Sequence, residues 1–223
     1  MTLAPELAGA SELVDELVRC GVRVSLGHTK ANASEARRAV RAGAIGATHL
    51  YNAMSPLHHR EAGMVGVALT SPTLFAEIIG DLVHVGADAF QVALAARGPE
   101  GLCLVSDALQ GAGTGCDVFH THGRRHSVRG GTAYLPAREP DGEPKLAGSA
   151  SSQLEMVRKL VASGIVSLAD ALTMASTTPA RALGCERELG RIATGAQADL
   201  LVLDETELAL RRVFLAGREL PCA

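Results

Sequence analysis

The stretch Ile45–Arg60, IGATHLYNAMSPLHHR, decides the fold, because an apolar, strand-like run ends there in His49 and a polar loop follows. Three further apolar runs end in the same way, and the polar residues that follow them include His28, His84 and Asp107. In α/β folds the loops after the strands gather on one face, where active sites are built. The pattern predicts an α/β protein with its functional site on that face.

Helical and strand-like segments alternate along the chain. Apolar residues at helical spacing, often closed by a glycine, predict helices over residues 7–19, 32–42, 87–96, 153–162 and 167–176. Short apolar runs predict strands over residues 22–26, 44–48, 63–69, 75–79 and 102–105. This alternation favours a parallel sheet with crossover helices.

Two regions depart from that alternation. Residues 111–146 are rich in Gly, Thr, His, Arg and Pro, which predicts a loop excursion with small hairpins near residues 125–129 and 132–135. Near the end of the chain, β-forming runs at residues 198–203 and 212–215 predict a small antiparallel β appendage.

Composition limits the class of protein. The chain has 223 residues, of which 47% are apolar and 3% aromatic, and its net charge of -3 includes no long run of one sign. Such a balance gives no basic footprint for a nucleic acid, so we expect no nucleic-acid partner. We also expect no membrane partner, since no apolar run approaches the ~20 residues that span a bilayer, and no signal-peptide pattern opens the chain. The five scattered cysteines form no CxxC pair, and we expect a cytoplasmic location.

His28 and His49 follow successive predicted strands, so their imidazoles are expected on neighbouring loops of one rim. Zinc and iron both accept neutral imidazole ligands. Either histidine alone is better explained as a group that caps a strand end or satisfies a loop carbonyl. Their paired placement favours a metal site.

Asp107 leaves the predicted strand at residues 102–105 on the same rim. One carboxylate there can take a proton from an attacking water and return it to the leaving group of an amide or ester. The structural alternative is an Asx turn that starts the following loop.

Three more polar groups accompany these residues. His84 is a candidate hydrogen-bond partner of a substrate carbonyl or hydroxyl, or equally a satisfied loop histidine. Asn52, the backbone of Ala53 and Arg60 share the loop after His49 and form a candidate anion cradle, for which phosphate suits the arginine fork. Arg60 alone is also consistent with a solvated surface charge. Five other histidines are left unassigned: His58, His59, His120, His122 and His126.

Several motifs, in order and at their intervals, resemble those of the N-acetylglucosamine-6-phosphate deacetylases of the amidohydrolase superfamily. They are GHTKANASEA (27–36), THLYNAMSPLHHREAG (48–63), DLVHV (81–85), LVSDA (104–108), LAGSA (146–150) and the tail GRIATGAQADLLVLD (190–204). The resemblance covers essentially the whole chain.

The resemblance implies specific roles for the strand-end residues. His28 and His49 would be ligands of one divalent metal ion, zinc or iron, and Asp107 the general base and acid acting on water. His84 would contact the substrate and help polarise its acetamide carbonyl. The implied reaction is hydrolysis of N-acetylglucosamine 6-phosphate to glucosamine 6-phosphate and acetate.

The resemblance also implies how a sugar phosphate is held. Asn52 and Ala53 would bind the phosphate through side chain and backbone. Arg60 would reach a phosphate, in the family's homodimers that of the neighbouring subunit. Leu146 and Ala147 would lie near the sugar and the acetyl group.

Two departures from the family pattern lead to a further expectation. The family's metal site also takes a glutamate from a GxHLEGP-like segment, which this chain lacks, and only five or six strand ends precede the tail, whereas a whole (β/α)₈ barrel takes ~250 residues. The expected fold is therefore an incomplete (β/α)₈ TIM-type barrel over residues 1–186, with strands of a small β-sandwich domain over residues 187–223. We expect such an N-terminally truncated chain to bind metal poorly and to have little activity. The alternatives are another hydrolase or deaminase of the superfamily, or an inactive fragment of the deacetylase.

Overall fold

The computed structural model describes residues 1–137 and 142–221 of the chain. Its largest sheet has five parallel strands in the sequential order β1-β2-β3-β4-β5. These strands are β1 (Thr2–Leu3), β2 (Ser25–Leu26), β3 (Gly46–Ala47), β4 (Phe75–Ile79) and β5 (Leu102–Val105). The predicted parallel sheet is thus confirmed, with strands at all predicted places except residues 63–69.

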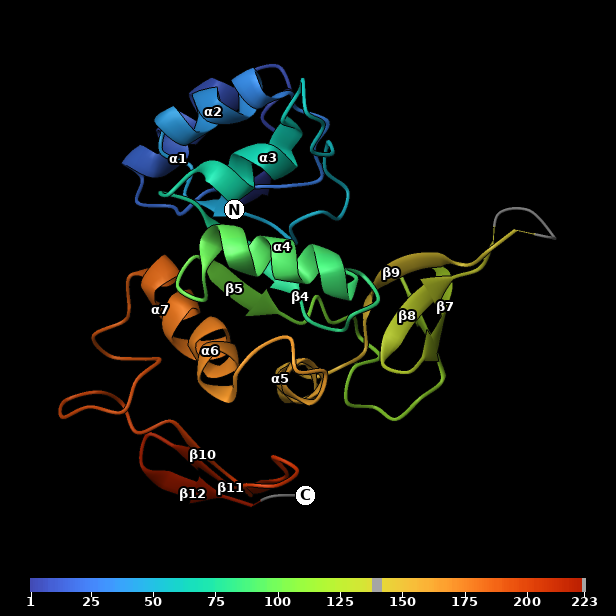
Figure 1. Cartoon of the computed structure of the whole chain (residues 1–223), viewed down its shortest axis with the longest axis vertical. Coiled ribbons are helices and arrows are strands. Elements are labelled where there is room, and N and C mark those ends of the chain that lie inside the picture. Colours follow the sequence, from blue (N-terminus) through green and yellow to red (C-terminus); the bar gives the residue numbers. More distant parts are fainter. Residues whose placement is uncertain (138–141, 222–223) are drawn as a thin grey trace.

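Helices connect the strands and continue after them. They are α1 (Ala10–Arg19), α2 (Ala33–Arg41), α3 (Gly63–Thr70), α4 (Ala87–Arg97), α5 (Gln153–Ala162), α6 (Leu168–Leu172), the π-helix η1 (Thr173–Thr177) and α7 (Thr178–Leu183). In α2 a capping box forms, in which Asn32 accepts from the N–H of Glu35 and the Glu35 carboxylate accepts from the N–H of Asn32. Figure 1 shows α4 on one side of β4 and β5, with α6 and α7 on the other.

The prediction of a strand over residues 63–69 was wrong, because this segment forms α3. Every residue from Gly63 to Leu69 is buried, so the segment is apolar all round and carries no helical stripe. A short, fully buried apolar run has no periodicity that separates a helix from a strand.

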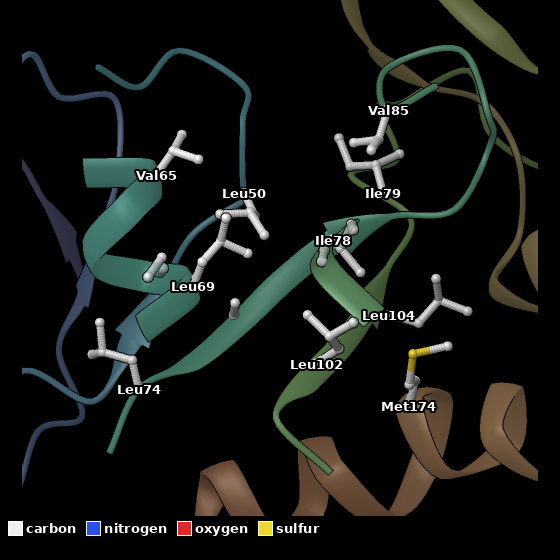
Figure 2. Packing of buried hydrophobic residues seen from close by; sticks show 14 of the residues in the cluster. Leu50, Val65, Leu69, Leu74, Ile78, Ile79, Val85, Leu102, Leu104 and Met174 are labelled. Atoms are coloured by element: carbon white, nitrogen blue, oxygen red, sulfur yellow. The ribbon is translucent and has the colours of Figure 1, made fainter. Parts of the chain in front are cut away.

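The main hydrophobic core lies between these helices and the central strands. Figure 2 shows Val65 and Leu69 on α3, with Leu69 turned toward β4, and Met174 of η1 beside Leu104 of β5. All four side chains belong to one buried cluster. The core therefore fixes β4 and β5, whose carboxyl ends carry His84 and Asp107.

The excursion is more ordered than the sequence predicts. It forms a four-stranded antiparallel sheet in the order β6-β7-β8-β9. Its strands are β6 (Val118–Thr121), β7 (Arg124–Arg129), β8 (Thr132–Leu135) and β9 (Lys145–Ser149). Both predicted hairpin segments are confirmed as β7 and β8. Residues 138–141 of the excursion lie outside the described residues.

The predicted β appendage is a three-stranded antiparallel sheet of β10 (Leu200–Leu203), β11 (Leu210–Leu215) and β12 (Arg218–Leu220). Arg158 of α5 ties it to the rest of the chain, because its Nε and Nη2 donate to the carbonyl of Leu208 at 2.9 and 2.7 Å. Residues 222–223, which the predicted appendage included, lie outside the described part.

The five parallel strands leave an open sheet, and the described residues form no closed barrel. Within residues 1–137 and 142–221, no helix is both long and apolar enough to cross a membrane.

Candidate metal centre and active site

His28 and His49 converge at the carboxyl ends of β2 and β3, as predicted. Their Nε2 atoms lie 2.8 Å apart, and the rings meet edge to face with centroids 4.5 Å apart. Both residues have left-handed backbones, with φ of 51° and 37°. Because such conformations are costly outside glycine and gather at functional sites, their occurrence at both strand ends fits a built site.

Gly27 allows the two strand ends to approach. A Cβ on Gly27 would lie 2.7 Å from the Cβ of Thr48, the residue before His49. The Thr48 hydroxyl also lies within hydrogen-bonding distance of the hydroxyls of Thr2, at 3.0 Å, and Ser25, at 2.7 Å. These contacts hold the loop after β2 against the loop after β3.

The histidine pair suits a divalent cation. His49 is only 6% exposed, and its Nδ1 is buried without a hydrogen-bond partner among the described residues. Two ligand nitrogens on one tetrahedral zinc lie roughly 3.3 Å apart, close to the separation seen here. Residues 1–137 and 142–221 hold no cluster of three or more His, Cys, Asp or Glu side chains arranged to bind a metal. The described chain therefore supplies two convergent imidazoles.

A pocket of ≈ 520 Å³ opens beside His28. Thr29 donates its N–H to the carbonyl of Ala53 at 2.9 Å, and Ser55 donates to the carbonyl of Thr29 at 3.0 Å, so the loop of Asn52 and Ala53 lies along the His28 loop. The lining residues are His28, Thr29, Lys30, Ala53, Met54, Ser55 and Pro56. Of the residues predicted to bind phosphate, Ala53 lines this pocket.

The other two residues predicted to bind phosphate, Asn52 and Arg60, do not line this pocket. Asn52 donates its side-chain amide to the carbonyl of Leu50 at 3.3 Å. Arg60 is exposed, and its Nη1 lies 2.9 Å from Nε2 of the adjacent His59. In the described part of this single chain, no hydrogen bond joins Arg60 to Asn52 or Ala53.

Lys30 is a pocket residue that sequence reasoning missed. Its backbone N–H donates to Glu6 at 2.7 Å, and the Thr29 hydroxyl also donates to Glu6. Burial raises the pKa of Glu6, but these hydrogen bonds and the Lys30 charge outweigh it and lower the pKa. The available signal was the position of Lys30, two residues after a strand-end histidine.

Asp107 follows β5 in a left-handed conformation with φ of 48°. The predicted LAGS segment reaches it, because Ser149 donates its N–H to the Asp107 carbonyl at 2.9 Å. A Cβ on Gly148 would lie 3.4 Å from Asp107 Oδ2. Leu146 and Ala147 are half-buried in β9, so they share a strand with the residues that contact Asp107.

Glu77 of β4 lies near His49 and Asp107, and sequence reasoning did not identify it. Burial raises its pKa, with the Asp107 charge acting in the same direction, while the N–H of His49 opposes it. Burial, assisted by the charge of Glu77, also raises the pKa of Cys103 to about 12, so this thiol is unreactive. Glu77 carries no strand-end signal, because it lies within the strand.

His84 follows β4, and its side chain is 5% exposed. Its Nδ1 lies 2.7 Å from Asp81 Oδ2, and its Nε2 is buried with no hydrogen-bond partner in the described structure. Burial raises the pKa of Asp81, but hydrogen bonds from His84 and from the N–H groups of His84 and Val83 lower it to about 2. Asp81 is therefore ionised at neutral pH.

A second pocket, of ≈ 400 Å³, extends along the sheet from the strand starts to Glu77 within β4 and Val105 at the end of β5. Its lining includes Arg23, Ile45 and Phe75, which start or precede β2, β3 and β4, and none of the predicted site residues. Because His28, His49, His84 and Asp107 do not line this pocket, we place the candidate site at the carboxyl rim.

Sequence comparisons identify the family of this chain. The sequence profile of the amidohydrolase family matches residues 3–220. An N-acetylglucosamine-6-phosphate deacetylase of Bos taurus is 39% identical over 97% of this chain and 53% of that protein. An N-acetylgalactosamine-6-phosphate deacetylase of Escherichia coli O157:H7 is 37% identical over 98% of this chain and 56% of that protein.

The fold agrees as well. The crystal structure of N-acetylglucosamine-6-phosphate deacetylase from Pasteurella multocida matches with a TM-score of 0.89 and 33% identity, covering 98% of this chain and 55% of that one. The chain spans about half the length of the curated relatives it matches. It belongs to the amidohydrolase family, and its sequence and fold are similar to those of the amino-sugar-phosphate deacetylases.

Proposed function

We propose that this chain carries the catalytic rim of a metal-dependent deacetylase that hydrolyses N-acetylglucosamine 6-phosphate to glucosamine 6-phosphate and acetate. The observation that carries the proposal is the convergence of His28 and His49, with Nε2 atoms 2.8 Å apart, on the rim that also bears Asp107. The similarity to deacetylases over nearly all of the chain supports the choice of reaction.

For the fold, we infer that residues 1–186 are part of a (β/α)₈ barrel and that residues 187–223 belong to a small β domain. The strand order supports the barrel, because five parallel strands follow one another without a reversal. A doubly wound sheet would reverse its strand order at a switch point.

In this proposal His28 and His49 hold one divalent ion, zinc or iron. Bound there, the ion would polarise the acetamide carbonyl and acidify the attacking water. Asp107 takes a proton from that water as its oxygen attacks the carbonyl carbon. Asp107 then returns the proton to the sugar nitrogen as the C–N bond breaks, which leaves acetate and the free amine.

The remaining predicted residues bind substrate. His84 presents Nε2 to the acetamide, and Leu146 and Ala147 line the sugar and acetyl side. The phosphate binds in the pocket beside His28, where Ala53 and Lys30 contact it. Asn52 stabilises the turn of this loop through its hydrogen bond to the Leu50 carbonyl. We propose that Arg60, exposed in this chain, reaches the phosphate of a second subunit in a homodimer.

The direct test is acetate release by the purified protein supplied with zinc or iron, using phosphorylated and unphosphorylated N-acetylglucosamine. The Asp107→Asn variant is the matched control, since asparagine tolerates the left-handed backbone that Asp107 adopts. We expect a low rate of release that prefers the phosphorylated sugar and falls at least ~100-fold in the control. Release that is equal in wild type and control would refute the role of Asp107.

A second candidate substrate is N-acetylgalactosamine 6-phosphate, because the Escherichia coli relative at 37% identity is named for it. The two sugars differ only at one hydroxyl. Comparing kcat/KM for both sugar phosphates in the same assay separates the candidates.

A further inference from the structure

Asp81 makes more contacts than a loop carboxylate needs. Its Oδ1 accepts from the N–H groups of Val83 and His84 at 2.9 and 2.8 Å. Its Oδ2 lies 2.7 Å from His84 Nδ1 and accepts from the hydroxyl of Thr132 at 3.1 Å. The Asp81 side chain is fully buried, and all four of these groups surround it.

We propose that Asp81, locked by Thr132, is a positioning residue that keeps a proton on Nδ1 of His84 and presents Nε2 to the substrate. The substrate named here rests on the proposed function, whereas the effect on the imidazole does not.

The hydrogen-bonding capacity of Asp81 determines which nitrogen of the His84 ring carries the proton. An ionised carboxylate only accepts hydrogen bonds, so His84 Nδ1 must be the donor to Asp81. Nδ1 is then protonated whether the ring is neutral or charged. Nε2 is the one ring nitrogen left for another molecule, and in the described structure it is buried without a partner. A buried polar atom of this kind is costly unless a ligand satisfies it.

Thr132 links this arrangement to Asp107. It is fully buried in β8 and pairs with Ser149 of β9. Ser149 donates its N–H to the Asp107 carbonyl at 2.9 Å and its hydroxyl to the Ser106 carbonyl at 2.6 Å. One pair of strands in the excursion therefore braces both the His84 loop and the Asp107 loop.

A purely structural explanation covers only half of these contacts. An Asx turn accounts for Oδ1 and its two backbone donors. It does not account for Oδ2, which faces a ring nitrogen and a hydroxyl. Asp81→Asn separates the two explanations, because asparagine keeps the Oδ1 acceptor and replaces Oδ2 with an N–H donor.

The primary test is ¹⁵N NMR of the histidine rings in the full chain, with His84 identified by the signal lost in His84→Gln. In the wild type we expect the Nδ1-protonated form. In Asp81→Asn the amide N–H would donate to Nδ1, and the ring proton would move to Nε2. With the proton on Nε2 instead of Nδ1, the imidazole presents the wrong hydrogen-bonding group to the substrate, and activity falls.

Thr132→Val and Thr132→Ser form the second pair of variants. Valine removes the hydroxyl that holds Asp81 Oδ2 at similar volume, so we expect the proton to stay on His84 Nδ1 while a weaker hydrogen bond to Oδ2 shifts the Nδ1 signal, and serine should restore the wild-type spectrum. Thr121→Val is the matched control, because Thr121 is buried in the same sheet and lies beside His122 instead of Asp81. In acetate release we expect kcat/KM to fall about 10- to 100-fold in Asp81→Asn, the usual loss when an outer partner is removed.

The readouts keep the two proposals apart. A folded Asp81→Asn protein that retains the Nδ1-protonated ring overturns the positioning role, whatever its activity. A moved proton in a protein whose wild type releases no acetate supports the positioning role and refutes deacetylase activity of this chain by itself.

Discussion

Gly27 lies so close to Thr48 that a Cβ on the glycine would come within 2.7 Å of the threonine Cβ. Gly27→Ala must therefore push apart the strand ends that carry His28 and His49. We expect a stability loss of about 1–3 kcal/mol, typical of overpacking, together with weaker metal binding. Thermal unfolding and metal titration measure the two effects.

The control for this variant is Gly86→Ala. A Cβ on Gly86 meets no atom within 4 Å, and its φ of -63° suits alanine. Metal binding should be unchanged in this variant. Equal metal binding in Gly27→Ala and Gly86→Ala would contradict the close approach of the two strand ends.

Asp81 makes the free energy of unfolding depend on pH in the acid range. Its folded pKa of about 2 lies below the ordinary value of 3.8, so its stabilising contribution is complete above pH 3.8 and disappears as the pH falls toward 2. The contribution is about 2 kcal/mol. Denaturant unfolding at pH 5 and pH 2.5 should show this loss in the wild type, and Asp81→Asn should lack that part of the pH dependence.

Lys30 is predicted to contribute to phosphate binding. Lys30→Met should raise KM for the sugar phosphate several-fold with little change in kcat, since a binding charge is removed while Asp107 is untouched. The unphosphorylated sugar serves as the internal control, and its KM should not change. A similar rise in KM for both sugars would place Lys30 outside the phosphate site.

Arg158 should hold the C-terminal sheet in place. Arg158→Met removes both hydrogen bonds to Leu208, worth about 1.5–3 kcal/mol for a charged donor. We expect faster amide exchange over β10, β11 and β12. Arg212→Met, which breaks an exposed pair with Glu219 inside that sheet, should have a smaller effect. Unchanged exchange in Arg158→Met would show that other contacts hold the sheet.

Strand ends were the most predictable part of the molecule. His28, His49, His84 and Asp107 each follow an apolar run, and the parallel sheet brings those ends to one rim. Topology therefore places residues that are far apart in the sequence on one rim, and it brings His28 and His49 together. The same reasoning failed for α3, because every residue from Gly63 to Leu69 is buried and the segment lacks the one-sided apolar stripe that identifies a helix.

Contacts between distant segments were not predictable from the sequence. Thr132 and Asp81 are 51 residues apart, and nothing in the composition of the excursion indicates which hydroxyl turns inward. Glu77 likewise lies within a strand, where the sequence does not distinguish a site carboxylate from a surface one. The outward position of Arg60 also depends on loop geometry rather than on its neighbours along the chain.

The central claim is that His28 and His49 bind one divalent ion. The most direct measurement is calorimetric titration of the metal-free protein with zinc, for the wild type, His28→Asn, His49→Asn and the exposed control His120→Asn. The account predicts one weakly held ion per chain, retained in His120→Asn and lost or further weakened in each of the other two variants. Undiminished binding in both His28→Asn and His49→Asn would contradict it.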